Sequence, residues 1–239
     1  MTTHEFILAT SPPHLALSHL ALYGLAAILD DAGDHDVLLS WTDTPDPRPR
    51  LHSTLTPEQV TATVHQHATD RADPASWLHT TFTSRGRSMA LLSPRISSLR
   101  GDDWTDLQQQ RHHALNTLRA RGTWLDQQLI AALGEPCYWS LTPQGELIQD
   151  NAANRFDMQP RNRGSEIVTT RLRPLAVALA KWTPQTIHTG LTGDTTTDTI
   201  GSQQHDSRTA TGLAPPGPTD NALTWCALWG LSQLPVTHR

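Results

Sequence analysis

The sequence is poor in cysteine and aromatic residues, and it has no long apolar run. Two cysteines in 239 residues, Cys137 and Cys226, are too few for a disulfide framework, and neither has a partner at metal-ligand spacing. No segment approaches the roughly 18–20 uninterrupted apolar residues of a membrane span, and residues 1–6 lack the basic start of a secretory signal. We therefore expect a cytoplasmic protein in which both cysteines are buried thiols.

Several catalytic and metal-binding signatures are also missing. The sequence contains no Cys-x-x-Cys, no His-Glu-x-x-His, no glycine-rich phosphate loop and no Gly-x-Ser-x-Gly. It has 13 histidines, but the close pairs His65/His67 and His112/His113 diverge around their predicted helices. We therefore predict no metal site, no cofactor and no catalytic residue.

Charge is divided unevenly along the chain. Seventeen arginines and one lysine oppose 23 acids, for a net charge of −5. Residues 1–80 carry −7, residues 81–181 carry +4 and residues 182–239 carry −2. Arginine grips phosphate bidentately, so the basic middle favours contact with a nucleic-acid backbone. An ordinary solvated face explains the same excess, and high genomic GC content explains the scarcity of lysine.

Apolar spacing and turn residues indicate an α+β fold dominated by helices, with a small N-terminal sheet and a helical C-terminal half. Helices are predicted at residues 14–33, 57–71, 104–121, 124–133, 166–182 and 221–234, and strands at 5–9, 36–41, 88–92 and 138–141. We expect an N-terminal α+β region at residues 1–100. A mostly helical region with long polar loops follows at 101–239, and the two regions are compatible with one continuous domain.

Two long polar segments, residues 149–165 and 193–218, interrupt the helices. A loop as long as the second is normally either functional or disordered, and we favour a functional one. Guanidinium groups suit phosphate, and carboxamides suit base edges. The candidate nucleic-acid-binding residues are Arg155, Arg161, Asn162, Arg163, Arg171, Arg173, Gln203 and Arg208. For Arg171 and Arg173, pairing with carboxylates near them on the helix is an equal alternative.

Residues 202–208 offer a different interpretation of the second polar segment. They gather serine, histidine, aspartate and arginine on one predicted loop, which suits a small cytosolic hydrolase. Composition alone also brings these residue types together in polar loops. A purely structural adaptor is a third possibility.

Three stretches, together with the helix around residues 20–29, carry a family resemblance. The first is GEPCYW at residues 134–139, and the second is NRGSE at 162–166 leading into RLRP at 171–174. The third is DSRTATGL at 206–213, which continues through Asp220, Asn221 and Ala222 to WCALWG at 225–230. Together they resemble proteins encoded among the CRISPR-associated genes of actinobacterial type I-G systems, formerly type I-U. The resemblance covers most of the chain and includes no catalytic signature.

The resemblance implies a non-enzymatic subunit similar to a reduced large subunit of the RNA-guided Cascade surveillance complex. Such a subunit reads a short motif beside the target and steadies the separated strands, while guide pairing supplies most sequence recognition. The implied partners are other CRISPR complex subunits, crRNA and target DNA, with no membrane. Asp206, Arg208 and Asn221 of the late polar region would suit close contact with a groove or backbone, and the acidic front would suit docking on a basic subunit.

Overall fold

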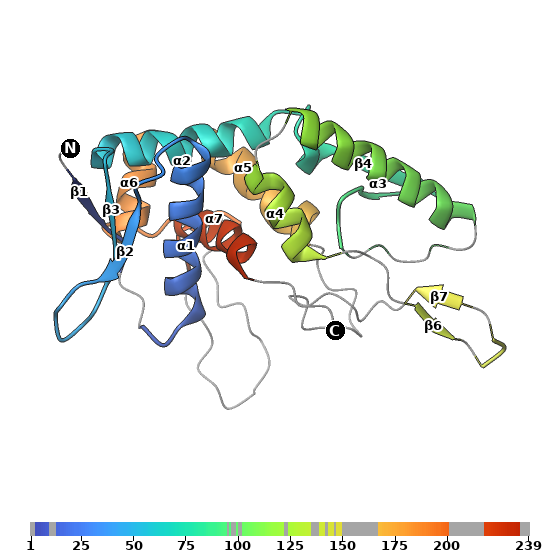
Figure 1. Cartoon of the computed structure of the whole chain (residues 1–239), viewed down its shortest axis with the longest axis horizontal. Coiled ribbons are helices and arrows are strands. Elements are labelled where there is room, and N and C mark those ends of the chain that lie inside the picture. The colour runs from blue at the N-terminus through green and yellow to red at the C-terminus, as the bar shows by residue number, and fades with distance from the viewer. Residues whose placement is uncertain are drawn as a thin grey trace. The chain divides into compact units, whose positions relative to one another are not determined.

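The computed structural model contains two compact units (Figure 1). It describes residues 3–9, 13–94, 96, 99, 102–121, 124–134, 139–141, 143–145, 147–149, 167–200 and 218–234. Unit 1 comprises Met1–Asp70 and Pro174–Leu231, and unit 2 comprises Arg71–Arg173 and Ser232–Arg239. This grouping differs from the predicted division at residue 100, because the C-terminal helices pack with the N-terminal region.

Unit 1 begins with a split β-α-β arrangement. Its elements are β1 (His4–Ile7), α1 (Ala16–Asp31), β2 (Leu38–Trp41), β3 (Pro49–Ser53), α2 (Pro57–Ala72), α5 (Arg173–Leu179), α6 (Pro184–Thr192), α7 (Asn221–Gly230) and the 3-10 turn η3 (Leu231–Gln233). Strand β3 lies between β1 and β2 and is antiparallel to both. The two outer strands are therefore parallel to each other, with α1 in the connection between them.

The sheet has one apolar face. Phe6 pairs with Leu51, and Leu51 pairs with Leu39, so these three side chains share a face. Phe6 and Leu51 are buried, and α1 contacts β3. The alternation of side chains along β1 and β3 thus fixes which face receives the helix.

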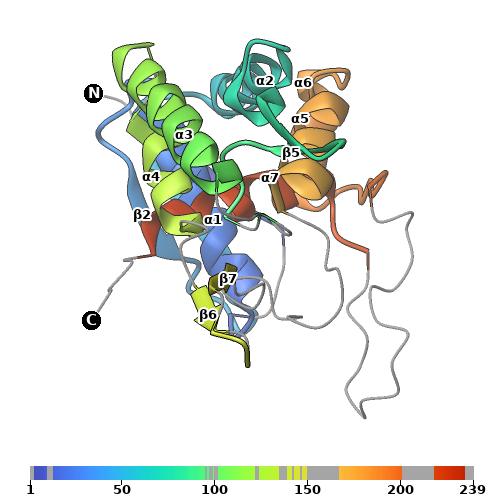
Figure 2. The same ribbon diagram turned by 90° about the vertical axis from the view of Figure 1, so that its right-hand side faces the viewer.

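Helices α1 and α7 cross at a glycine contact in the core of unit 1 (Figures 1 and 2). A side chain at Gly24 would collide with the backbone carbonyl of Cys226, and one at Gly230 would collide with the carbonyl of Leu20. The two backbones therefore approach more closely than bulkier residues allow. Cys226 is fully buried there, which confirms the prediction of a buried thiol for this cysteine, and burial raises the pKa of the thiol to about 12. Cys137 lies outside the described residues.

An aromatic cluster joins α2 to α7. The indole Nε1 of Trp225 donates to His67 Nδ1 at 3.1 Å, and the His67 ring meets the Trp229 ring edge-on at a centroid distance of 4.5 Å. All three side chains are buried. His67 is therefore part of the core.

Unit 2 combines short hairpins with two main helices. Its elements are the 3-10 turn η1 (Trp77–His79), β4 (Thr81–Ser84), β5 (Arg87–Ala90), α3 (Asp102–Arg121), α4 (Trp124–Leu133), β6 (Trp139–Leu141), β7 (Leu147–Gln149) and the π-helical turn η2 (Val168–Leu172). Strands β4 and β5 are joined by Arg85 and Gly86, with φ of 51° and 76°. Two positive φ values match the type I′ turn of a two-residue hairpin.

The α+β fold class predicted from the sequence is confirmed. The sequence prediction missed β3, β4, β7 and α6. Helix α6 did have a detectable start, because Thr183 caps it and Pro184 occupies its first turn. Among the described helices, none combines the length and the apolar character needed to cross a membrane.

Candidate nucleic-acid interface

The two units carry opposite net charge. Unit 1 holds four cations and thirteen acids, a net charge of −9, whereas unit 2 holds fourteen arginines and ten acids, a net charge of +4. The positive segment identified from the sequence therefore coincides closely with unit 2. On net charge alone, unit 2 is the more favourable of the two for an anionic polymer.

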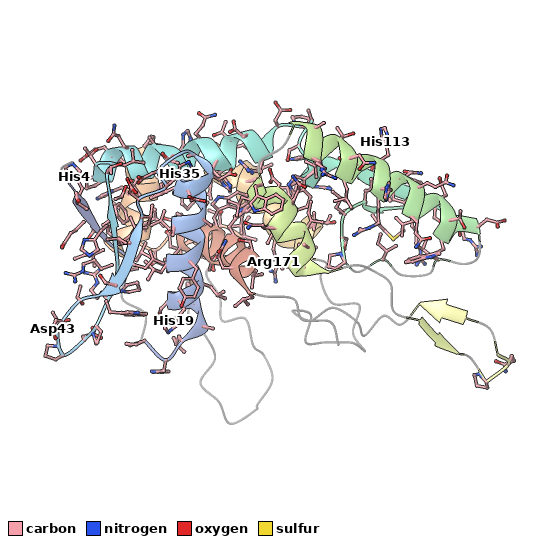
Figure 3. All side chains as sticks on the ribbon, viewed as in Figure 1. His4, His19, His35, Asp43, His113 and Arg171 are labelled. Carbon is pink, nitrogen blue, oxygen red and sulfur yellow. The ribbon has the colours of Figure 1, made fainter. Side chains whose placement is uncertain are left out.

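The structure describes two of the predicted site residues, and they have different surroundings. Arg171 is exposed on η2, and its guanidinium donates to the carbonyl of Thr170 at 3.3 Å (Figure 3). Arg173 is half-buried, and its Nε donates to the carbonyl of Leu78 at 2.8 Å. Within the described residues, neither arginine pairs with a carboxylate. Arg171 is therefore available to a phosphate, while Arg173 holds η1 in place.

The other predicted site residues lie outside the described residues. They are Arg155, Arg161, Asn162, Arg163, Gln203 and Arg208. Residues 202–208, which supported the hydrolase alternative, also lie outside them. Of the residues proposed for groove contact, Asn221 is described. It is buried at the start of α7, and its side chain donates to Thr199 Oγ1 at 2.6 Å, so it has a structural role.

Two further arginines of unit 2 are buried and hold the fold together. Arg71 forms a two-pronged contact with Asp126, with Nε to Oδ1 at 3.3 Å and Nη2 to Oδ2 at 3.0 Å, and Trp77 Nε1 also donates to Asp126 Oδ1 at 2.8 Å. Arg111 donates to the carbonyls of Leu91 and Ser93 at 2.7 and 2.9 Å. These cations are therefore not part of the exposed surface, and the net charge of unit 2 overstates its exposed basic groups.

Exposed arginines remain on three elements of unit 2. Arg87 begins β5, Arg119 lies near the end of α3, and Arg171 lies on η2. In the described part of the chain, no carboxylate lies within ion-pair distance of these three. Arg85 differs, because its Nε lies 3.1 Å from Asp103 Oδ2. Among the described arginines of unit 2, the best-placed candidates for phosphate contact are therefore Arg87, Arg119 and Arg171.

Helix α3 presents a polar stripe to solvent. Its members recur every three or four residues, so they lie on one side of the helix. They are Thr105, Gln108, His112, Asn116 and Arg119, and all are exposed. Amides, imidazoles and a guanidinium offer donors and acceptors to both bases and phosphates.

A pocket of about 530 Å³ lies beside another side of α3. Its lining comprises Ala75, Trp77, Thr80, Thr81, Leu91, Asp106, Gln109, Gln110, His113, Ala114, Thr117 and Leu118. Gln109, Gln110 and His113 are all exposed, and the Gln110 amide donates to Asp106 Oδ2 at 3.0 Å. Figure 3 shows the position of His113 on α3. The buried Asp126 and Arg111 contacts fix Trp77 and Leu91 of the wall. A rigid wall with polar groups at its rim suits a flat polar ring such as a nucleobase.

The outer face of the unit 1 sheet carries a cross-strand polar network. Ser40 Oγ lies 3.1 Å from His52 Nε2, and His52 Nδ1 lies 3.7 Å from Glu5 Oε1. This is the residue order of a hydrolase triad, but 3.7 Å is too long for a hydrogen bond. Arg50 also donates to Ser40 Oγ at 3.0 Å and lies 3.5 Å from Glu5. The network therefore ties the three strands of the sheet together.

This pocket was not predicted from the sequence. The pocket needs residues 75–91 to fold back against α3, and no local pattern specifies that contact. Within the described ranges, histidine, cysteine, aspartate and glutamate side chains do not gather in groups of three suited to a metal ion.

Comparison with family models, curated proteins and solved structures found no match. Interpretation of the surface therefore depends on its own chemistry and on the resemblance described above.

Proposed function

We propose that this chain is a non-enzymatic subunit of an RNA-guided type I CRISPR interference complex that contacts crRNA or target DNA through unit 2. The observation that carries the proposal is the exposure of Arg87, Arg119 and Arg171 on the basic unit while unit 1 is strongly acidic. Such a division suits a protein that holds an anionic strand on one unit and meets other subunits through the other.

The exposed groups of α3 are better suited to holding a nucleic-acid strand than to reading its base sequence. Arg119 supplies charge, and Gln108, His112 and Asn116 supply hydrogen bonds that any strand can use. In an RNA-guided complex, pairing with the guide carries most of the sequence information. The pocket beside α3 is suited to one unpaired base, which matches a role in steadying separated strands.

The test is salt-dependent binding of single-stranded RNA and DNA by the full chain. Fluorescence anisotropy between about 50 and 200 mM salt gives the slope of log affinity against log salt, which falls by about 0.7–0.9 for each phosphate contact removed. Arg119→Ala should lower this slope, and the triple variant Arg87→Ala/Arg119→Ala/Arg171→Ala should lower it about three times as much. Lys181→Ala removes an exposed cation of unit 1 and is the matched control, with no expected change.

Equal slopes for the wild type and the triple variant would overturn the proposal. The hydrolase alternative is tested on the same preparation with a fluorophosphonate probe and an ester substrate. We expect no labelling and no turnover by the isolated chain, and co-purification with RNA-bearing partners from cells that express the complex. Labelling at Ser40 that His52→Ala abolishes, or at Ser202 that His205→Ala abolishes, would replace the proposal with an enzyme.

A further inference from the structure

The outer edge of β2 presents exposed apolar side chains. β2 is hydrogen-bonded to β3 on one side, and in the described part of the chain no strand pairs with its other side. Leu38 is 67% exposed and Leu39 is 39% exposed, on opposite faces of the strand. Soluble proteins usually protect such edges with lysine, proline or a bulge, and the sequence LLSW has none of these.

The opposite edge of the same sheet is protected. Strand β1 contains Glu5, and just beyond the strand the amide of Ala9 donates to the carbonyl of Leu191 at the end of α6. Arg48 donates to the carbonyls of both Leu8 and Thr192 at 3.1 and 2.8 Å, which ties that edge to α6. The exposure of β2 is therefore a property of one edge and not of the sheet as a whole.

An apolar and aromatic patch on α1 adjoins β2. Leu15 at the N-cap of α1 and His19 and Tyr23 within the helix are spaced four residues apart, and Leu15 and Tyr23 are 42% and 37% exposed. The His19 ring lies 5.0 Å from the Trp41 ring of β2 and 6.3 Å from the Tyr23 ring (Figure 3). If a further strand paired with the outer edge of β2, the side chains on one of its faces would lie on this patch.

Exposed carboxylates flank β2 at both ends. Asp36 is exposed just before the strand, and Asp43 and Asp46 are exposed on the loop just after it (Figure 3). A partner strand along this edge would therefore meet negative charge at each of its ends. This arrangement selects for arginine or lysine at both ends of the partner segment.

The same charges disfavour a second copy of this chain. An antiparallel pairing of two β2 strands centred on Leu39 and Ser40 would place Asp36 opposite Asp43. A parallel pairing in register would place each aspartate beside its own copy. Like charges directly opposite each other destabilise a strand pair.

We propose that β2 binds an extended basic segment of another protein as an additional strand of the sheet. Backbone hydrogen bonds to the free edge provide affinity, alternate apolar side chains of the segment lie on Leu39, Trp41 and the α1 patch, and its basic ends face Asp36 and Asp43. The surface lies on unit 1, so it is independent of the strand contacts proposed for unit 2.

The probe is a short synthetic peptide of alternating valine and threonine with paired arginines at both ends. We expect the full chain to bind it at least about tenfold more tightly than the same peptide with glutamates in place of the arginines. Replacing the central valine with proline should abolish binding, because proline removes a ladder donor. Fluorescence anisotropy with labelled peptides gives all three affinities.

Variants of the chain locate the site. Leu39→Arg should weaken binding of the basic peptide at least about tenfold, whereas Leu234→Arg, at a leucine of similar exposure (37%), should not. Asp36→Lys/Asp43→Lys changes only exposed residues and should reverse the preference to the glutamate peptide. In each of the three variants, adding Arg87→Ala/Arg119→Ala/Arg171→Ala should still lower the salt slope of nucleic-acid binding as it does in the wild type, so failure of this proposal is distinguishable from failure of the proposed function.

Equal binding of the arginine and glutamate peptides, or equal loss from Leu39→Arg and Leu234→Arg, would overturn the proposal. Sedimentation of the chain at several concentrations tests whether a second copy of the chain occupies this edge instead. A dimer that Leu39→Arg dissociates would show that a second copy covers β2.

Discussion

Unit 1 and unit 2 differ in what occupies their interiors. In unit 1, α1 and α7 meet at Gly24 and Gly230, and the surrounding core is apolar or aromatic. In unit 2, buried arginines bind a carboxylate and backbone carbonyls. Unit 1 buries carboxylates instead, at Asp34, Asp198 and Asp220, whereas the buried cations Arg71 and Arg111 lie in unit 2. Net charge therefore overstates the exposed charge of both units.

The strongest test of this difference is Asp126→Ala in unit 2. It removes the carboxylate that faces the Arg71 guanidinium, and both side chains are less than a tenth exposed. Breaking a buried pair on one side costs about 3–5 kcal/mol, so we expect a loss of that size in the free energy of unfolding. Chemical denaturation measures the loss, and hydrogen exchange should place the earliest opening in unit 2.

A loss below about 1 kcal/mol for Asp126→Ala would show that the buried pair does not hold unit 2 together. Arg85→Ala is the matched control, because it breaks an ion pair of the same residue types whose arginine is 58% exposed.

Gly24→Ala tests the crossing in unit 1. The added carbon meets the backbone of Cys226 and Gly230, and neither can move as a flexible side chain would. We expect a loss of about 3 kcal/mol, although alanine normally stabilises a helix relative to glycine. In a Cys137→Ala background, the variant should also speed the reaction of Cys226 with a thiol reagent, since the thiol is otherwise fully buried.

Ala16→Val is the control for this crossing. It adds carbon to α1 at an exposed position and should cost less than about 1 kcal/mol. A similar cost for the two variants would mean that α1 and α7 separate easily.

The smallest effect is expected at the surface of unit 1. His35 Nδ1 lies 2.8 Å from Asp30 Oδ1, and this hydrogen bond, with the attraction of the carboxylate, raises the pKa of His35 above its ordinary value of 6.5. The protonated histidine therefore favours the fold below pH 6.5, and the benefit disappears as the pH rises through the raised value. His35→Ala should lower the melting temperature slightly in acid and not at alkaline pH. An equal change at both pH values would contradict this account.

Local pattern was sufficient for the long helices and insufficient for elements that depend on neighbours. The apolar spacing of α1 and the closing tryptophans of α7 identified both helices. Strand β3 has the sequence PRLHS, with a single large apolar residue, and it becomes a central strand because β1 and β2 flank it. Such a strand is specified by tertiary pairing rather than by its own composition.

The candidate site was only partly predictable for a related reason. Arginine is usually a surface residue, so the sequence does not distinguish Arg171, which is exposed, from Arg173, which donates to Leu78. The same limit applies to Arg71 and Arg111. The exposed glutamines of α3 were visible in the sequence, but the pocket beside them requires a contact between distant segments.

The glycine crossing also has a consequence for how the protein is made. Helix α1 ends at Asp31 and its packing partner α7 begins at Asn221, so the ribosome synthesises α1 long before α7. The face of α1 around Gly24, Leu25 and Ile28 stays uncovered until α7 emerges, while the continuous stretch of unit 2 emerges in between. A nascent chain of this protein therefore exposes an apolar helix face for longer than a chain whose packing partners are close in sequence. We expect chaperones that bind apolar segments to recognise this face.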